Sequence, residues 1–286
     1  VKKFPNGHYA EVKNGQANFV KYWDLESQIA PITLKDEKQA IHQLQDLLIS
    51  SVDYRLRSDV PFGVFLSGGI DSSTVAAIAQ SRSSQKIKTF SIGFKEAKFN
   101  ESTYAQAVSN ALNTEHHEYT LSYHDAIALV PQITKIYDEP YADASSIPTY
   151  LVSKIARQEV KMVLTGDGGD EQFLGYGMYN WADRLNKPVL NYLKKPIKTG
   201  LKATKKPRLK RIAELFDFDE STDLMAHIFS AEQYLFTEKG LNEVYQHEKI
   251  QMSLQLEEIN RKLSAKEKQA LFDLKYYLKD DLLTKV

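Results

Sequence analysis

The hydrophobic pattern of the chain alternates between short apolar runs and longer stretches in which apolar residues recur with helical spacing. Strands that alternate with helices indicate βαβ units, which wind right-handed into a parallel sheet. The pattern therefore predicts a doubly wound α/β fold. We expect strands at residues 62–66, 86–94, 115–121 and 160–164, and helices at 36–57, 74–80, 101–112, 124–137 and 146–157.

Both ends of the chain follow other patterns. Residues 8–12 and 17–22 are strand-like and are joined through Asn14-Gly15, which predicts a β-hairpin. Because two strands alone are marginal in water, we expect this hairpin to belong to a larger sheet or to pack on the next domain. A linker is expected at residues 27–34. The part from Ser221 onward is predicted to be helical.

The segment from Lys187 to Arg211 holds ten basic residues, no acidic ones and three prolines. Its only aromatic residue is Tyr192, so the base-stacking pattern of a nucleic-acid surface is lacking. We predict a solvated, mobile loop, because unpaired positive charges and prolines disfavour a long helix.

Composition narrows the class of protein. The 286 residues are 42% hydrophobic and 26% charged, with zero net charge, which is ordinary for a globular chain and gives no global field toward nucleic acid or membrane. The absence of cysteine excludes disulfides, thiolate metal sites and a cysteine nucleophile within this sequence. No signal peptide or long apolar run is seen, so we expect a cytoplasmic location.

The most informative stretch is Ser67-Gly68-Gly69-Ile70-Asp71-Ser72-Ser73, between the first predicted strand of the sheet and its helix. Glycines let the backbone approach a ligand, and the turn with the helix N-terminus offers N–H groups to an anion. Asp71 is an oxygen ligand suited to Mg²⁺. The stretch matches neither a Walker A loop nor the dinucleotide fingerprint. It predicts a nucleotide loop, with a plain strand-to-helix turn as the alternative.

A second loop, residues 165–171, contains three glycines and three acids. The spacing excludes an EF-hand, and a simple helix-capping loop remains the alternative. Because ligands of parallel sheets bind at the carboxyl ends of the strands, we expect residues 67–73, 92–94 and 165–171 to converge.

Two further polar features leave alternatives open. Residues 138–146 either contact an acid substrate, or Asp143 or Ser145 simply caps the following helix. His116 and His117 are neighbours in a predicted strand and point to opposite faces, so they do not form a metal-binding pair.

The seven residues from Ser67 to Ser73 resemble the PP-loop of ATP pyrophosphatases. Together with further matching stretches, the sequence resembles glutamine-dependent asparagine synthetases. The further stretches are residues 60–66, 89–94, 138–140, 148–151, 163–171 and 276–283, while 187–265 match least. The resemblance implies a sheet of the PP-loop, or adenine nucleotide alpha hydrolase, type. It also implies that residues 1–26 are the terminal hairpin remnant of a glutaminase domain, and that 27–286 are a synthetase domain truncated at its C-terminus.

The function implied by the resemblance is ATP-dependent carbon–nitrogen ligation. Aspartate would be amidated to asparagine through β-aspartyl-AMP, with release of AMP and pyrophosphate. Ammonia would come from glutamine through the glutaminase domain of the same parent chain. In the family, a later segment brings a lysine to the phosphates; it would lie beyond Val286, so this chain alone is expected to be catalytically incomplete. ATP and Mg²⁺ are the implied cofactors, a homodimer is expected, and nucleic acid and membrane partners are not.

The resemblance also assigns roles to individual residues. Asp71 and Asp170 would ligate Mg²⁺, and Asp167 would stand for a glutamate that accepts a proton from ammonia in some members. The implied catalytic residues are Asp167, Asp170 and Glu171. The implied ATP-binding residues are Leu66, Ser67, Gly68, Gly69, Asp71, Ser72, Ser73, Ile92, Thr165 and Gly166. Two alternatives remain open: another PP-loop enzyme that amidates or cyclises a different carboxylate, as a β-lactam synthetase does, and a non-catalytic nucleotide-binding module.

Overall fold

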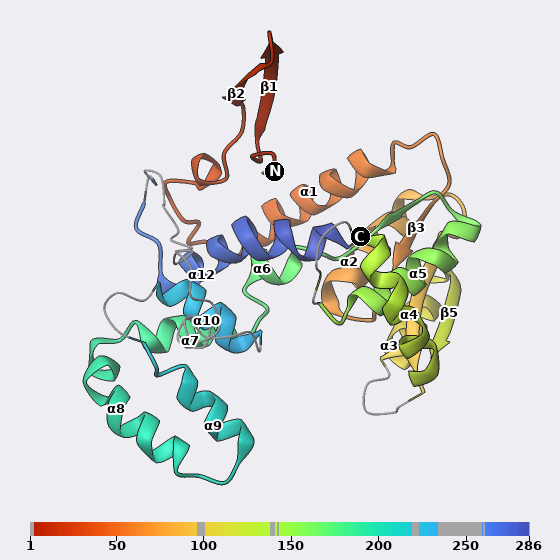
Figure 1. Ribbon diagram of the computed structural model, residues 1–286. Helices are drawn as coiled ribbons and strands as arrows, with labels where there is room; N and C mark the ends of the chain where they lie inside the picture. The colour runs from red at the N-terminus through yellow and green to blue at the C-terminus, as the bar shows by residue number, and fades with distance from the viewer. Residues whose placement is uncertain are drawn as a thin grey trace. The chain divides into compact units, whose positions relative to one another are not determined.

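The computed structural model describes residues 3–95, 101–137, 141, 143–218, 223–233, 259 and 261–285 (Figure 1). The chain divides into two compact units, each formed from separate stretches of sequence. One unit contains residues 38–179 and 269–286, and the other contains residues 1–37 and 180–268. Each unit is described by itself.

The first unit is built on a parallel sheet of four strands. These are β3 (Phe62–Phe65), β4 (Lys88–Phe94), β5 (Glu115–Leu121) and β6 (Met162–Leu164). Their order in the sheet is β5-β4-β3-β6, and every neighbouring pair is parallel. The chain steps from β3 outward to β5 and then returns to the other side of β3. A topological switch point therefore lies between β3 and β6, where ligands of such sheets bind.

Helices cover both faces of this sheet, as a doubly wound fold requires. They are α1 (Glu37–Leu56), α2 (Ile70–Arg82), α3 (Ser102–Leu112), α4 (Tyr123–Ile136), α5 (Ser146–Glu159) and the short α6 (Gly169–Phe173). Val64 packs in a core with residues of α1, α2 and α3, whereas its neighbour Phe65 packs on the opposite face against α5. This alternation confirms the predicted α/β class.

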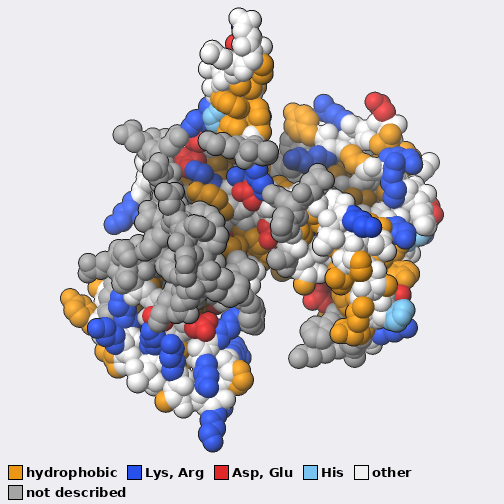
Figure 2. Space-filling model, viewed as in Figure 1, with side chains coloured by type: hydrophobic (Ala, Val, Ile, Leu, Met, Phe, Trp, Pro, Cys, Tyr) orange, Lys and Arg blue, Asp and Glu red, His pale blue; other side chains and the backbone are white. Residues whose placement is uncertain are grey.

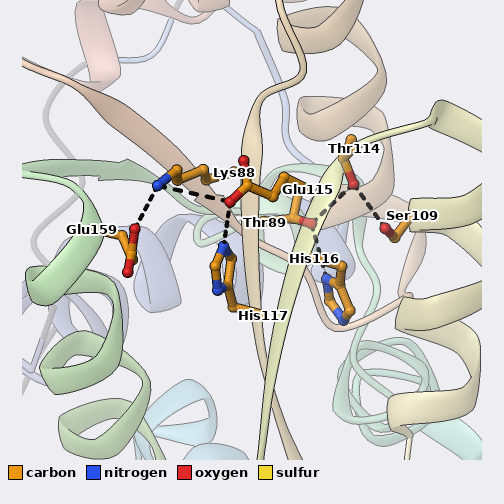
Figure 3. Close-up of polar contacts among 8 residues, drawn as sticks. All are labelled: Lys88, Thr89, Ser109, Thr114, Glu115, His116, His117 and Glu159. Carbon is orange, nitrogen blue, oxygen red and sulfur yellow. Dashed lines mark hydrogen bonds and ion pairs between the residues drawn. The ribbon is translucent and has the colours of Figure 1, made fainter.

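The beginnings of β4 and β5 carry two separate polar groups (Figure 3). The Lys88 ammonium lies 2.5 Å from the Glu159 carboxylate at the end of α5, and Glu115 accepts a 3.1 Å contact from His117. His116 instead meets the Thr89 hydroxyl, 2.9 Å from its Nδ1. The two histidines therefore have different partners. These groups join the amino ends of the strands, away from the loops at their carboxyl ends.

The end of the chain returns to the first unit. Helix α12 (Ala265–Asp273) continues into the π-helical turn η3 (Leu274–Leu278), and the 3₁₀ turn η4 (Leu282–Thr284) follows. Ala270 and Leu271 are buried as their spacing predicts. Leu274 and Leu278 are only partly buried, because the wider π-turn rotates the residues after Asp273 off the face of α12.

The second unit opens with the predicted hairpin, formed by β1 (His8–Lys13) and β2 (Gln16–Lys21), with η1 (Glu26–Gln28) after it. Asn14 and Gly15 both have positive φ, 51° and 76°, which is the geometry of the turn that the Asn-Gly pair favours. Within the described part of the chain these two strands form a sheet of their own.

The rest of this unit is helical, and it corrects one prediction. Its helices are α7 (Met178–Leu185), α8 (Pro188–Lys202), α9 (Pro207–Glu214) and α10 (Leu224–Glu232). The loop predicted from Lys187 to Arg211 is wrong, because α8 and α9 occupy most of it. Two of its prolines begin these helices, where the missing N–H costs nothing, and only Pro196 lies inside one. The apolar spacing of Leu190, Ile197 and Leu201 was the helical signal.

Candidate nucleotide-binding site

The first loop leaves β3 and enters α2 through a turn that only glycine allows. The Leu66 N–H donates to the Phe90 carbonyl at 2.8 Å, so the ladder extends one residue beyond the strand. Gly68 follows with a φ of +85°. A Cβ on Gly68 would lie 2.5 Å from the Tyr104 Cβ and 2.6 Å from the Ala105 N of α3. The chain therefore turns here with its backbone tight against α3.

Serine hydroxyls hold the first loop in shape. The Ser67 and Ser72 hydroxyl oxygens are 2.9 Å apart, and the Gly69 N–H donates to Ser67 Oγ at 3.2 Å. The Ser67 N–H donates to Ser72 Oγ, so these two backbone donors are already used within the loop. The buried Ser73 hydroxyl has no hydrogen-bond partner in the described residues. An unmade buried hydrogen bond of this kind costs free energy.

The second loop leaves β6 and enters α6 in a similar way. Gly168 has a φ of +88°, and the Gly169 N–H donates to the Gly166 carbonyl at 3.2 Å. After α6 the chain turns at Gly175, where a Cβ would lie 1.8 Å from Asp170 Oδ1. The Asp170 carboxylate thus lies directly over a glycine, and α6 begins after a glycine with positive φ.

The two loops are in contact, as predicted for the carboxyl ends of neighbouring parallel strands. A Cβ on Gly169 would lie 2.5 Å from the Asp71 Cγ, and one on Gly166 would lie 2.8 Å from the Ser72 N. The Asp71 carboxylate therefore lies against the first residue of α6. The contact occurs at the switch point of the sheet, between β3 and β6.

The carboxylates of Asp71 and Asp170 are close enough to act on each other electrostatically. Burial raises the pKa of Asp170, and the charge of Asp71 raises it further, so the two carboxylates repel each other. The described residues contain no group of three or more side chains that could hold a metal ion. Mg²⁺ typically uses one or two carboxylates together with phosphate and water oxygens. The pair therefore fits a magnesium ion that arrives with a nucleotide.

The other residues implied by the resemblance are spread around this contact. Asp167 is exposed on the second loop, and Thr165 and Gly166 are half-buried beside it. The Leu66 side chain is 1% exposed in the core toward α1–α3, so only its backbone is left for a ligand. Ile92 is half-buried on the other face of the sheet, with the residues around Phe90 and Leu121.

Glu171 is turned into the interior rather than outward. Its side chain is 1% exposed, its Oε1 accepts a 2.9 Å hydrogen bond from the Tyr176 hydroxyl, and its Oε2 has no hydrogen-bond partner in the described residues. Burial raises its pKa. The buried surroundings of Glu171 favour a structural role, in which its side chain anchors α6, over the catalytic role that the resemblance implies.

A second buried carboxyl group, Asp273, lies in the same interior and was not predicted from the sequence. It is fully buried and accepts a long, 3.4 Å hydrogen bond from Gln269 Nε2. The buried Tyr179 hydroxyl interacts with Asp273, but no hydrogen bond of good geometry satisfies it. Burial raises the pKa of Asp273 to about 7. The signal was present: Gln269 and Asp273 are four residues apart, on either side of the apolar Ala270-Leu271-Phe272.

We expect Asp273→Asn to stabilise the protein at pH 8 more than at pH 5. The folded-state pKa of about 7 lies above the unfolded value, so the stability linked to this proton is complete below the unfolded pKa. It is lost as the pH rises through about 7. The folded-state pKa exceeds the ordinary pKa of aspartate by about three units. A neutral asparagine should therefore raise the free energy of unfolding by up to about 4 kcal/mol above pH 7.

Urea unfolding of parent and variant at both pH values measures this difference. Asp46→Asn, on the exposed side of α1, is the matched control and should change little at either pH. An effect of Asp273→Asn that is the same at pH 5 and pH 8 would contradict the buried, proton-binding carboxyl.

A group of polar side chains that connects the end of the chain to the start of α5 was also not predicted from the sequence. The buried Lys285 ammonium contacts the Asp143 carboxylate and the Ser145 hydroxyl, and the Tyr141 hydroxyl donates to Asp281 Oδ1 at 2.7 Å. Burial alone would raise the pKa of Asp143, but the Lys285 ammonium and the hydrogen bonds from Ser145 hold it below its usual value.

The predicted alternatives for residues 138–146 are only partly testable, because residues 138–140 and 142 lie outside the described part of the chain. Asp143 Oδ1 accepts from the Ser145 N–H at 2.8 Å, just before α5 begins. The Ser145 side chain makes no capping hydrogen bond and instead donates to Asp143. Asp143 therefore shapes the entry to α5, and contact with a substrate stays a prediction.

Comparison with known proteins gives one family and several relatives. Residues 43–285 match the family described as Asparagine synthase. A putative asparagine synthetase (glutamine-hydrolyzing) 2 of Methanocaldococcus jannaschii is 41% identical over 205 residues, covering 70% of this chain and 38% of that protein. Asparagine synthetase (glutamine-hydrolyzing) 1 of Bacillus subtilis is 35% identical over 180 residues, covering 63% and 28%. Asparagine synthetase B (glutamine-hydrolyzing) of Escherichia coli is 34% identical over 199 residues, covering 64% and 36%.

These alignments cover between 28% and 38% of each relative, so the chain spans well under half the length of the curated proteins it matches. Among solved structures, an NH₃-dependent NAD synthetase from Campylobacter jejuni aligns over 76% of this chain and 100% of its own. That alignment has 19% identity and a TM-score of 0.35.

Proposed function

The chain belongs to the asparagine synthase family, and from that premise we propose that it binds Mg·ATP at its two glycine–acid loops and adenylates a carboxylic acid. One observation carries the proposal. The Asp71 carboxylate lies against Gly169 and beside Asp170, at the switch point of a parallel sheet. Two carboxylates next to a turn lined with hydroxyls suit a magnesium-bound polyphosphate.

We further propose that the acid is aspartate and that the product is asparagine. A side-chain carboxylate oxygen of aspartate attacks the α-phosphorus, the bond to the bridging oxygen breaks, and pyrophosphate leaves. Ammonia then attacks the acyl carbon of β-aspartyl-AMP, AMP leaves, and the nitrogen loses a proton. The relatives named above are described as glutamine-hydrolyzing, which supports glutamine as the ammonia source through a glutaminase domain.

The residues of the first loop would hold the phosphates. In this proposal the hydroxyls and glycines of residues 67–73 cradle pyrophosphate, with Ser73 offering its unused hydroxyl. Asp71 and Asp170 would hold Mg²⁺, whose charge would neutralise phosphate charge and favour departure of pyrophosphate.

Residues of the other strand ends would complete the site. Ile92, Thr165, Gly166 and the backbone of Leu66 frame the adenosine. Asp167, which is exposed on the second loop, would accept the proton from ammonia.

The test supplies the purified full-length protein, including the proposed glutaminase domain, with Mg·ATP, ammonium and either aspartate or glutamate, and measures pyrophosphate and AMP together. We expect equal amounts of both products with aspartate and neither with glutamate. With ¹⁸O in the aspartate side-chain carboxylate, one labelled oxygen should appear in AMP, because that oxygen forms the new bond to the α-phosphorus. ADP and phosphate as products would contradict the proposal. Pyrophosphate release with a different acid alone would favour the β-lactam synthetase-like alternative.

A further inference from the structure

Helix α8 carries an uncovered apolar stripe on the surface of the second unit. Val189, Tyr192 and Leu193 are 66%, 86% and 46% exposed, and their spacing of three and four residues places them on one face of the helix. Pro196 extends the same face by one turn. Leu190 and Ile197 lie on another face and are partly buried. Both faces of α8 therefore carry apolar residues, and the outer one is left in contact with water.

Lys and Arg side chains gather over the part of the surface formed by α8 and α9 (Figure 2). Lys198 pairs with Asp217 at 2.5 Å, and the Lys194 ammonium donates to the Phe218 carbonyl at 2.9 Å. Other cations on α8, on α9 and between the two helices are exposed and have no ion pair or side-chain hydrogen bond to any residue that the structure describes. These are Lys195, Lys205, Lys206, Arg208 and Lys210.

We propose that the α8–α9 hairpin, residues 188–214, docks on an anionic membrane surface. Val189, Tyr192 and Leu193 enter the interfacial layer, and the exposed cations face the lipid headgroups. A surface helix with an apolar face beside a lysine-rich face is the pattern of interfacial membrane helices. Tyrosine is also favoured at the level of the headgroups.

Charge complementarity selects the partner. A nucleic acid would satisfy the cations but would leave Val189 and Leu193 in water. An apolar groove of a protein would cover the stripe but would not pair the cations around it. Anionic lipid does both, because its acyl boundary accepts the stripe and its headgroups accept lysine and arginine.

This surface was not predicted from the sequence for two reasons. The net charge of zero is a sum over the whole chain and conceals a local excess of cations, and residues 187–211 were predicted to be a loop. No described helix is long and apolar enough to cross a bilayer, so the proposed contact lies in the plane of the surface. It involves none of the proposed nucleotide-binding residues and stands independently of the proposed function.

Sedimentation with vesicles tests the proposal. The whole protein should bind vesicles of phosphatidylcholine mixed with phosphatidylglycerol, should not bind phosphatidylcholine alone, and should dissociate at high salt. Two double variants, Tyr192→Ser/Leu193→Ser and Lys205→Gln/Lys206→Gln, should each lower the partition coefficient by about tenfold or more. Lys35→Gln/Lys38→Gln is a charge-matched control on exposed residues, and Ile32→Ser, which is 80% exposed, is an apolar control. Neither control should change binding.

Three outcomes would overturn the proposal: no binding to the anionic vesicles, binding that the Tyr192→Ser/Leu193→Ser variant leaves unchanged, or controls that weaken binding as much as the hairpin variants. Binding of transfer RNA that depends on the cations and not on the stripe, without vesicle binding, would show a polyanion surface instead. Circular dichroism and thermal melting of every variant establish that the fold is kept. Pyrophosphate release without vesicles should be the same for parent and hairpin variants.

Discussion

Asp71→Asn should reduce pyrophosphate release by about 100-fold or more while leaving the fold intact. The side chain lies against Gly169, where a neutral group of the same size still fits. What is lost is one of the two negative charges proposed to hold Mg·ATP. Removing one electrostatic contact to the developing charge of a transition state typically costs about 10²-fold or more in rate. With the neighbouring charge gone, the pKa of Asp170 should also fall toward its ordinary value.

Calorimetric titration with Mg·ATP and initial rates of pyrophosphate release measure this effect. Asp71→Glu should be as damaging, because the longer side chain would collide with the backbone at Gly169. Asp46→Asn, which removes an exposed carboxylate from α1, is the control for net charge. Equal Mg·ATP affinity in the parent and in Asp71→Asn would exclude this carboxylate from the site.

Gly68→Ala should destabilise the first unit by about 3 kcal/mol or more and abolish ATP binding. A residue with a Cβ pays about 1–2 kcal/mol to adopt the φ of +85° found here. The new methyl group would in addition lie 2.6 Å from the backbone N of Ala105, which cannot move without shifting α3. Since whole domains are stable by only about 5–15 kcal/mol, this is a large fraction of the total.

Gly168→Ala separates the backbone strain from the steric collision. Gly168 has a φ of +88°, but a Cβ added there would lie no closer than 3.4 Å to another atom, which belongs to the flexible Gln172 side chain. It carries the backbone strain without the collision. Chemical unfolding of both variants should therefore show a clearly greater loss for Gly68→Ala. An equal loss of unfolding free energy in both variants would mean that the close approach of Gly68 to α3 does not contribute to the destabilisation.

Much of the first unit could be predicted because its signals are local. The strand from Glu115 to Leu121 has the predicted bounds, and the glycine-rich turns after β3 and β6 could be located from residue type alone. Their convergence followed from the rule that parallel strands end at one edge of a sheet. The contact of Asp71 with Gly169 is a detail that this rule does not contain.

The errors and omissions share a physical origin. For residues 187–211, proline and charge counts obscured an apolar spacing that was present. The Lys285–Asp143 pair and the burial of Asp273 beside Tyr179 depend on segments far apart in the sequence, which no local pattern reports. The hairpin and the synthetase region were predicted as separate domains at residue 26, and that boundary stays a prediction.

The discontinuity of the first unit sets an order of events during synthesis. Residues 38–179 leave the ribosome before residues 180–268, and only then does the stretch from Gln269 arrive. At about 5–20 residues per second, this interval is on the order of ten seconds. During it, Glu171 and Tyr179 lack the helix that buries them, and Asp143 lacks its lysine partner. The interior around Glu171 and Tyr179 is therefore the last part of the first unit that can close during synthesis.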